Sequence, residues 1–238
     1  MITITLFLSY GNPGDGKTTQ HVSLCKCLPD SIYLVLERKD EELLERKGDG
    51  IVFKVIEQFD ENYMEDPIAT LDNLNMQFKE IMNTGKYKNV FVDGVSDIRG
   101  FSMKEWIYKD NRARKAAGEK TRESIAGENL SAWSAINDRT KSIIRPLVNW
   151  ATVKRTNVFF TAQMKDNYIN NKKVGQAINI GEWLEYDVDV KVKLYRDRDG
   201  NFMASFAKVP GWANICENDV PISRDSYIAL LAERGLIR

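Results

Sequence analysis

Residues 11–18 read Gly-Asn-Pro-Gly-Asp-Gly-Lys-Thr, which is the complete G-x-x-x-x-G-K-[ST] pattern of a phosphate-binding loop. The apolar run before it, residues 2–8 (ITITLFL), predicts the strand that such a loop follows. A polyphosphate needs a concave ring of backbone N–H donors, and glycine lets the chain curl tightly enough to aim those donors inward. The helix expected after the loop would add its N-terminal donors and the positive end of its dipole. The sequence therefore predicts a nucleoside-triphosphate site.

The residues of this loop have separate expected tasks. Lys17 is expected to reach the β- and γ-phosphates, the Thr18 hydroxyl to hold Mg²⁺, and Thr19 to donate to the α-phosphate. The alternative, a glycine-rich turn without a ligand, is disfavoured because every position of the pattern and both flanks agree. The residues expected to contact ATP are Gly11, Asn12, Pro13, Gly14, Asp15, Gly16, Lys17, Thr18 and Thr19.

The composition is that of an ordinary globular protein, with 43% hydrophobic and 29% charged residues in a chain of 238. We therefore expect one domain with embellishments. The formal net charge is zero, so a polyanion or an anionic membrane could bind only through a local patch. Three cysteines without a C-x-x-C pair and a single histidine, His21, argue against a disulfide framework or a zinc site.

The location expected for this chain is a reducing cytoplasm. The strand predicted from Ile2 leaves no room for a signal peptide. No apolar stretch approaches the length of a bilayer span, so no membrane partner is expected.

Short β-rich runs alternate with longer helical patterns. The runs are residues 32–36, 51–55, 89–93 and 158–162. Continuous apolar strands separated by helices are typical of a parallel sheet that is covered on both faces. The sequence therefore predicts an α/β fold in which helices flank a mainly parallel central sheet.

Two long helices are expected between these strands. Apolar residues at helical spacing predict the first over residues 67–82, ending near Gly85. The second is expected over about 130–153, with a kink at Pro146.

The C-terminal part should contain a hairpin and a helix. Residues 188–195 alternate apolar and charged side chains, the Asp199-Gly200 pair signals a tight turn, and residues 202–209 return as a second strand. A terminal helix is expected over residues 223–234, with Ser223 as its N-cap.

Three polar residues end predicted strands on the rim that carries the phosphate loop. Asp93 matches the acidic residue that anchors Mg²⁺, because a buried strand ending in a carboxylate is costly unless a cation or donor meets it. The alternative is a helix N-cap or turn aspartate. Gly94 follows it, so a catalytic base has to lie elsewhere. Glu37 could polarise the attacking water, although it could also be a surface glutamate. Gln163 is a candidate γ-phosphate sensor, although polar strand ends are common.

These motifs resemble the RecA-like core, and more narrowly the small phage-type ATP-binding proteins associated with single-strand annealing. The resemblance is carried by residues 11–19, Glu37, the segment 92–97 (VDGVSD) and residues 161–163 (TAQ), within a match over roughly residues 1–210. It implies an ATPase that binds single-stranded DNA and assists homologous annealing. Position 163 is often histidine in those relatives, whereas it is glutamine here, as in RecA itself.

The resemblance also implies a domain layout. A single RecA-like domain would span residues 1–238, with a basic insertion at about 100–128 and the C-terminal hairpin and helix at about 186–238. Residues 192–198 resemble the RecA strand whose basic pair reaches the neighbouring subunit's nucleotide. Arg196 and Arg198 are therefore candidate fingers acting in trans within a homo-oligomer. The alternative is two solvated arginines beside a turn.

Two basic stretches are candidates for contact with DNA. Residues 104–122 are rich in lysine and arginine and carry Trp106 and Tyr108, so a flexible segment there could follow phosphates and stack bases. Residues 165–173 follow the sensor strand, where RecA-like proteins carry a mobile DNA-binding loop. The alternative for both is a solvated surface. The candidate contacts are Lys109, Arg112, Arg114, Lys115, Lys165, Lys172 and Lys173.

The first function hypothesis is thus an ATP- and Mg²⁺-dependent enzyme of single-stranded DNA recombination or annealing. A viral DNA-packaging or other motor ATPase is the second, and Gly94 disfavours it. An ATP-gated binding module with negligible turnover is the third. A nucleotide or nucleoside kinase would use residues 104–122 as a lid, and a GTPase is disfavoured because no N-K-x-D motif follows the 158–162 strand.

Overall fold

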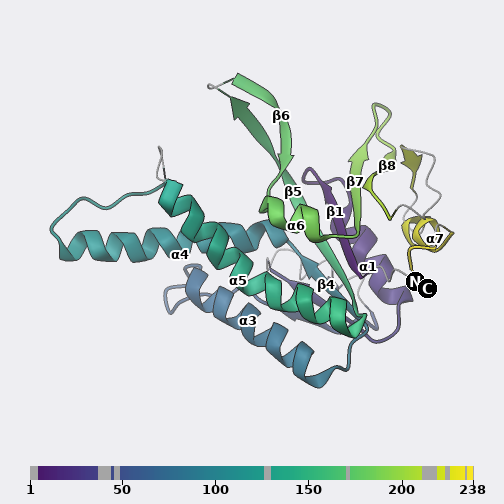
Figure 1. Ribbon diagram of the computed structural model, residues 1–238, viewed down its shortest axis with the longest axis horizontal. Coiled ribbons are helices and arrows are strands. Elements are labelled where there is room, and N and C mark those ends of the chain that lie inside the picture. Colours follow the sequence, from purple (N-terminus) through teal and green to yellow (C-terminus); the bar gives the residue numbers. More distant parts are fainter. Residues whose placement is uncertain are drawn as a thin grey trace.

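The computed structural model describes residues 5–36, 44–45, 49–125, 130–169, 172–210, 219–222, 226–233 and 235–237. Helices cover both faces of a mostly parallel central sheet (Figure 1). The predicted fold class is confirmed. No helix within the described ranges is long and apolar enough to cross a membrane.

The sheet has the strand order β3-β2-β4-β5-β1-β7-β8-β9, and β6 pairs with β5 outside this row. All pairs from β3 through β1 to β7 are parallel, whereas β8 pairs antiparallel with both β7 and β9. The bounds are β1 Leu6–Gly11, β2 Ser31–Val35, β3 Phe53–Val55, β4 Asn89–Asp93, β5 Asn157–Ile169, β6 Lys172–Ile178, β7 Val190–Arg196, β8 Phe202–Lys208 and β9 Val220–Pro221.

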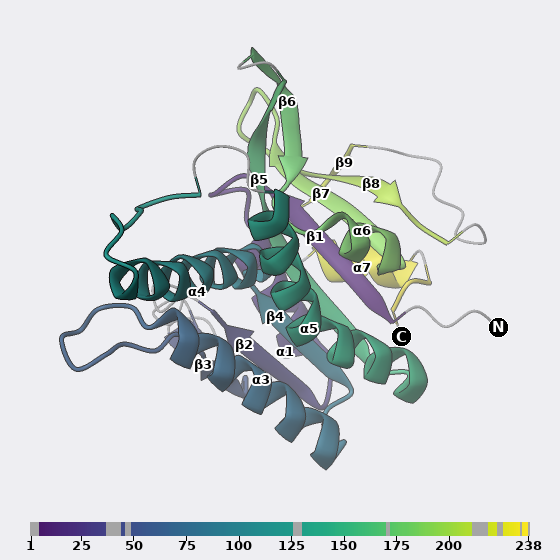
Figure 2. The ribbon, with the colours of Figure 1, turned by 60° about the vertical axis from the view of Figure 1, so that its left-hand side comes forward.

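Three long helices, α3 (Pro67–Thr84), α4 (Val95–Ala116) and α5 (Leu130–Lys154), lie on one face of the sheet (Figure 2). On the other face lie α1 (Lys17–Cys27) and α7 (Ser226–Glu233). The short α6 (Glu182–Asp187) belongs to the first face, where Leu184 shares a core with residues of α5. Sequence signals explain the bounds of α3. Asp66 accepts hydrogen bonds from two first-turn N–H groups, Pro67 opens the helix, and Gly85 ends it at φ 56°.

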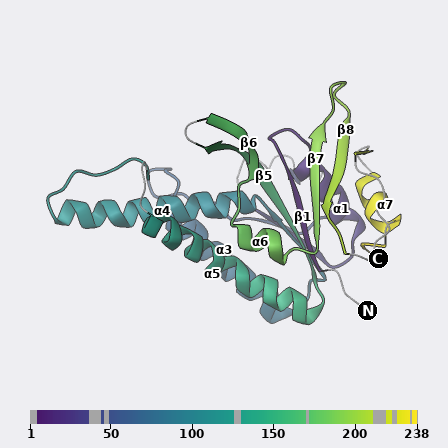
Figure 3. The same cartoon turned by 45° about the horizontal axis from the view of Figure 1, so that its top comes forward.

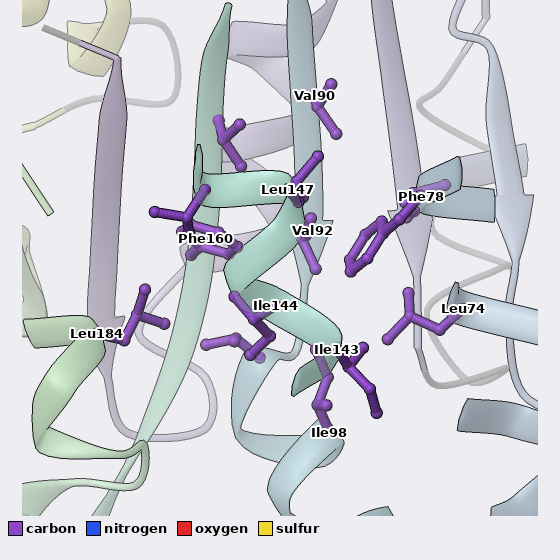
Figure 4. Packing of buried hydrophobic residues seen from close by; sticks show 14 of the residues in the cluster. Leu74, Phe78, Val90, Val92, Ile98, Ile143, Ile144, Leu147, Phe160 and Leu184 are labelled. Atoms are coloured by element: carbon purple, nitrogen blue, oxygen red, sulfur yellow. The ribbon is translucent and has the colours of Figure 1, made fainter. Parts of the chain in front are cut away.

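Each face of the sheet has its own core. Alternate residues of a strand point to opposite faces, and Val90, Val92 and Phe160 meet α3, α4 and α5 (Figure 4). The opposite core holds a row of stacked rings, since Phe159 lies 4.5 Å from both Phe7 and Phe91 between ring centroids. These buried rows fix the register that brings the carboxyl ends of β1, β2, β4 and β5 to one rim.

Two segments differ from the sequence-based expectations. The expected strand 158–162 continues to Ile169 and pairs with β6, so the expected mobile loop 165–173 is instead an antiparallel hairpin that projects beyond the sheet (Figure 1). The expected flexible basic segment is helical as far as Ala116, and α4 extends well beyond the sheet (Figure 3). Helix α7 agrees with the predicted terminal helix, whose expected cap Ser223 lies outside the described residues.

Candidate nucleotide site

The phosphate loop joins the end of β1 to the start of α1. Gly14 and Gly16 have φ values of 86° and 83°, a region that only glycine adopts without strain. Gly11 is required for a different reason. A Cβ atom there would lie 2.2 Å from the backbone oxygen of Leu194 on β7, so the strand that carries the loop passes too close to its neighbour for any side chain.

Lys17 closes this loop from inside. Its ammonium donates to the backbone oxygens of Gly11 at 3.0 Å and Asn12 at 2.8 Å. The Asn12 N–H in turn donates to the Asp15 carboxylate at 2.6 Å. Thr18 and Thr19 follow in the first turn of α1 and are half-buried. The loop is therefore already curled around the lysine that is expected to meet the β- and γ-phosphates.

Asp93 lies at the carboxyl end of β4, where it is buried and held by two hydroxyl groups. The Tyr33 hydroxyl on β2 donates to Oδ2 at 2.8 Å, and the Thr161 hydroxyl on β5 donates to Oδ1. The Gly94 N–H donates to the Thr161 hydroxyl at 2.7 Å. The N-cap of α4 is Gly94 and has no side-chain cap, which excludes the alternative that Asp93 caps this helix.

The residues present fit Mg²⁺. A carboxylate oxygen of Asp93 and the Thr18 hydroxyl are the hard oxygen ligands that this ion takes, with the remaining positions left to water and phosphate. No group of three or more histidine, cysteine or acidic side chains able to hold a metal occurs within the described ranges.

Gln163 lies between the two motifs because β5 runs between β1 and β4. It is in register with Gly11 on β1. Its N–H donates to the Ser96 hydroxyl at 2.8 Å, and its backbone oxygen accepts from Asn179 N–H at 2.8 Å. The base candidate Glu37 lies outside the described residues, so its role stays a prediction.

Sequence reasoning missed the buried polar residues that support this rim. Tyr33 and Thr161 belong to apolar strands, and they lie 60 and 68 residues from their partner Asp93 in the sequence. His21 is fully buried on α1, with Nε2 2.9 Å from the Ser9 hydroxyl. Burial lowers the pKa of His21 to about 4, so the ring is neutral at pH 7 beneath the phosphate loop. A polar residue inside an apolar strand is the signal that could have identified the first two.

The two candidate arginines, Arg196 at the end of β7 and Arg198 just after it, occupy different positions. Arg196 reaches the phosphate loop of its own chain, with Nε 3.4 Å from the Gly14 oxygen, and its guanidinium stacks 4.3 Å from the Phe202 ring. Arg198 is exposed in the turn between β7 and β8. Contact with a neighbouring subunit's nucleotide stays a prediction for both.

The candidate DNA contacts on α4 are partly neutralised. Lys109 pairs with Glu105 at 2.6 Å and Arg114 pairs with Asp110 at 2.8 Å, while Arg112 and Lys115 are exposed. Trp106 packs in a small apolar cluster with Ile125 and Ile136 and is covered by Arg122 at 5.5 Å. This packing occupies the Trp106 ring, whereas Tyr108, the other ring expected to stack bases, is exposed.

The hairpin formed by β5 and β6 touches the nucleotide site directly. The Gln176 amide on β6 donates to the Asn12 side-chain oxygen at 3.1 Å. Lys172 is exposed, and Lys173 pairs with Asp166 at 2.7 Å across the hairpin. The hairpin and the phosphate loop therefore share a hydrogen bond across one edge of the rim.

The arrangement at this rim defines a nucleotide-binding domain of the phosphate-loop ATPase type. A protein-family model described as an AAA domain matches residues 5–213, and the chain belongs to that family. A search of curated proteins found no match to the chain.

Proposed function

We propose that this protein is a Mg²⁺-dependent ATPase that acts on single-stranded DNA in recombination or annealing. The observation that carries the proposal is the contact of Gln176 with Asn12, which links a projecting hairpin to a phosphate loop. The AAA domain supports the ATPase part. The resemblance to phage-type annealing proteins supports the DNA part.

Different residues of this chain bind the phosphates of ATP, hold the metal and take part in hydrolysis. Loop N–H groups bind the phosphates, and Lys17 moves from the oxygens of Gly11 and Asn12 to the β- and γ-phosphates. Thr18 and Asp93 would hold Mg²⁺, which supplies positive charge against the phosphate oxygens. The hydroxyls of Tyr33 and Thr161 keep the Asp93 carboxylate in place. Glu37 accepts the proton of the attacking water, and Gln163 contacts the γ-phosphate.

The hydrogen bond between Gln176 and Asn12 links the bound nucleotide to the position of the hairpin that meets DNA. When Asn12 turns toward a bound nucleotide, its hydrogen bond with Gln176 changes, and the hairpin has a different preferred position in each nucleotide state. The exposed Lys172 and the α4 residues Arg112 and Lys115 meet the DNA backbone. Arg198 completes the site of a neighbouring subunit in a homo-oligomer.

Fluorescence anisotropy of labelled oligonucleotides tests this proposal. The Glu37→Gln variant with ATP and Mg²⁺ is expected to bind a single strand more tightly than the same variant with ADP, because the amide keeps the nucleotide and removes the base. Tighter binding of duplex than of single strand would favour a packaging motor. Equal affinity with both nucleotides would contradict the link through the hairpin.

A further inference from the structure

Two positively charged side chains, Arg99 and Lys165, lie at the base of the β5–β6 hairpin. Arg99 on α4 donates to the side-chain oxygens of Asn137 at 3.3 Å and Asn179 at 3.4 Å, and its guanidinium lies 5.0 Å from the Trp133 ring. Lys165 is on β5. Within the described ranges, no carboxylate lies within ion-pair distance of Arg99 or Lys165.

The strand register brings the two charges together. The Asn179 N–H donates to the Gln163 oxygen at 2.8 Å, and Lys165 is paired with Ala177 at the next step of the same ladder. Arg99 contacts Asn179, so Lys165 lies about one ladder step, roughly 7 Å, from the residue that Arg99 touches. The backbone of Gln163 is also fixed to α4 through Ser96.

Electrostatics agree with this placement. Burial lowers the pKa of the Arg99 guanidinium. Burial and then the nearby charge of Arg99 lower the pKa of Lys165. Three other cations of α4 and the hairpin differ from these two, since Lys109, Arg114 and Lys173 each pair with a carboxylate. Arg99 is half-buried and Lys165 is exposed, and an anion held between these two like charges would offset both the burial of Arg99 and their mutual repulsion.

We propose that Arg99 and Lys165 form a phosphate-binding site that takes a backbone phosphodiester of single-stranded nucleic acid. This inference rests on the proposed function. Trp133 holds the Arg99 guanidinium, whose planar donors suit two phosphate oxygens, and Lys165 adds a second charge. Helix α4 and the hairpin leave the rim in different directions, so a bound strand has exposed cations on both sides of this site (Figure 1).

Anisotropy titrations with a labelled oligothymidylate over a range of salt concentrations measure the contact. Lys165→Gln and Arg99→Lys are each expected to weaken binding about tenfold. The first substitution removes a charge, and the second removes the planar guanidinium that can donate to two phosphate oxygens. Lys165→Gln should flatten the slope of log K against log salt by about 0.7, the loss of one single-strand phosphate contact. Lys26→Gln, at the far end of α1, is the charge-matched control and should change neither quantity.

A second readout separates this site from the proposed function. In protein labelled with ¹³C at the lysine side chains, inorganic phosphate is expected to raise the pKa of Lys165, and Arg99→Gln should abolish that response. A Lys165 pKa that phosphate leaves unchanged would overturn the proposal even if the protein binds DNA. If phosphate raises the pKa of Lys165 but the protein binds no oligothymidylate, the proposed function is refuted. The assignment of the site to nucleic acid is then refuted as well, and the two residues form only a site for a free anion. Weaker ATP binding with unchanged oligothymidylate affinity would assign the phosphate to the nucleotide and overturn the proposal.

Discussion

Replacing Tyr33 by phenylalanine tests whether Asp93 is held ready for a metal. The substitution removes one hydroxyl and leaves the ring, which stacks on Phe91 with 5.6 Å between centroids. The lost bond joins a fully buried donor to a buried carboxylate at 2.8 Å. Hydrogen bonds to charged groups contribute about 1.5–3 kcal/mol, and burial leaves no solvent to replace this one.

Two measurements follow from that magnitude. Urea denaturation of Tyr33→Phe should give a free energy of unfolding lower by about 1.5–3 kcal/mol. The Mg²⁺ concentration for half-maximal ATP hydrolysis should rise about tenfold or more, as is typical when a residue that orients a metal ligand is lost.

Tyr195→Phe is the matched control, because the Tyr195 hydroxyl donates to the Asp219 carboxylate at 2.7 Å at the surface. There the loss should stay below about 1 kcal/mol, and the Mg²⁺ dependence should not change. Equal losses in the two variants, or an unchanged Mg²⁺ dependence in Tyr33→Phe, would refute the reasoning.

Three further variants test other parts of the rim. Lys17→Ala should bind ATP at least a hundredfold more weakly by calorimetry while its thermal unfolding changes little, because this cation serves the phosphates; normal affinity would end the phosphate-loop assignment. Gly11→Ala should lower the free energy of unfolding by about 1–3 kcal/mol through its clash with Leu194, whereas Gly100→Ala in open space on α4 should raise it by about 0.5–1 kcal/mol. The folded-state pKa of His21, about 4, is below its unfolded value near 6.5, so the unfolded chain binds the extra proton and stability falls as pH drops through that interval. The loss should approach about 3 kcal/mol and be absent in His21→Gln, and identical pH profiles of the two proteins would contradict it.

Local signals made much of the fold predictable. The glycine pattern located the phosphate loop, and apolar residues at helical spacing, with Gly85 at the end, located α3. The hairpin was missed because residues 165–167 are polar and exposed, so their strand structure depends on pairing with β6. The ion pairs of α4 could have been predicted from the sequence, since Glu105 and Lys109 have the four-residue spacing at which opposite charges pair on one helix face.

The support of the site was less predictable than the motifs themselves. Tyr33 and Thr161 meet Asp93 only because β2, β4 and β5 are adjacent at one rim, and strand order is not a local property of sequence. The same holds for the contact between Gln176 and Asn12. Motifs predicted which residues carry the chemistry, whereas the residues that position them required the strand order.

Phosphate release from ATP, measured with Mg²⁺ while a single-stranded oligonucleotide is titrated in, tests the central claim most directly. Turnover is expected to rise with the single strand and to disappear in Lys17→Ala. Turnover that ignores the single strand, or no turnover under conditions where calorimetry shows that ATP binds, would contradict it.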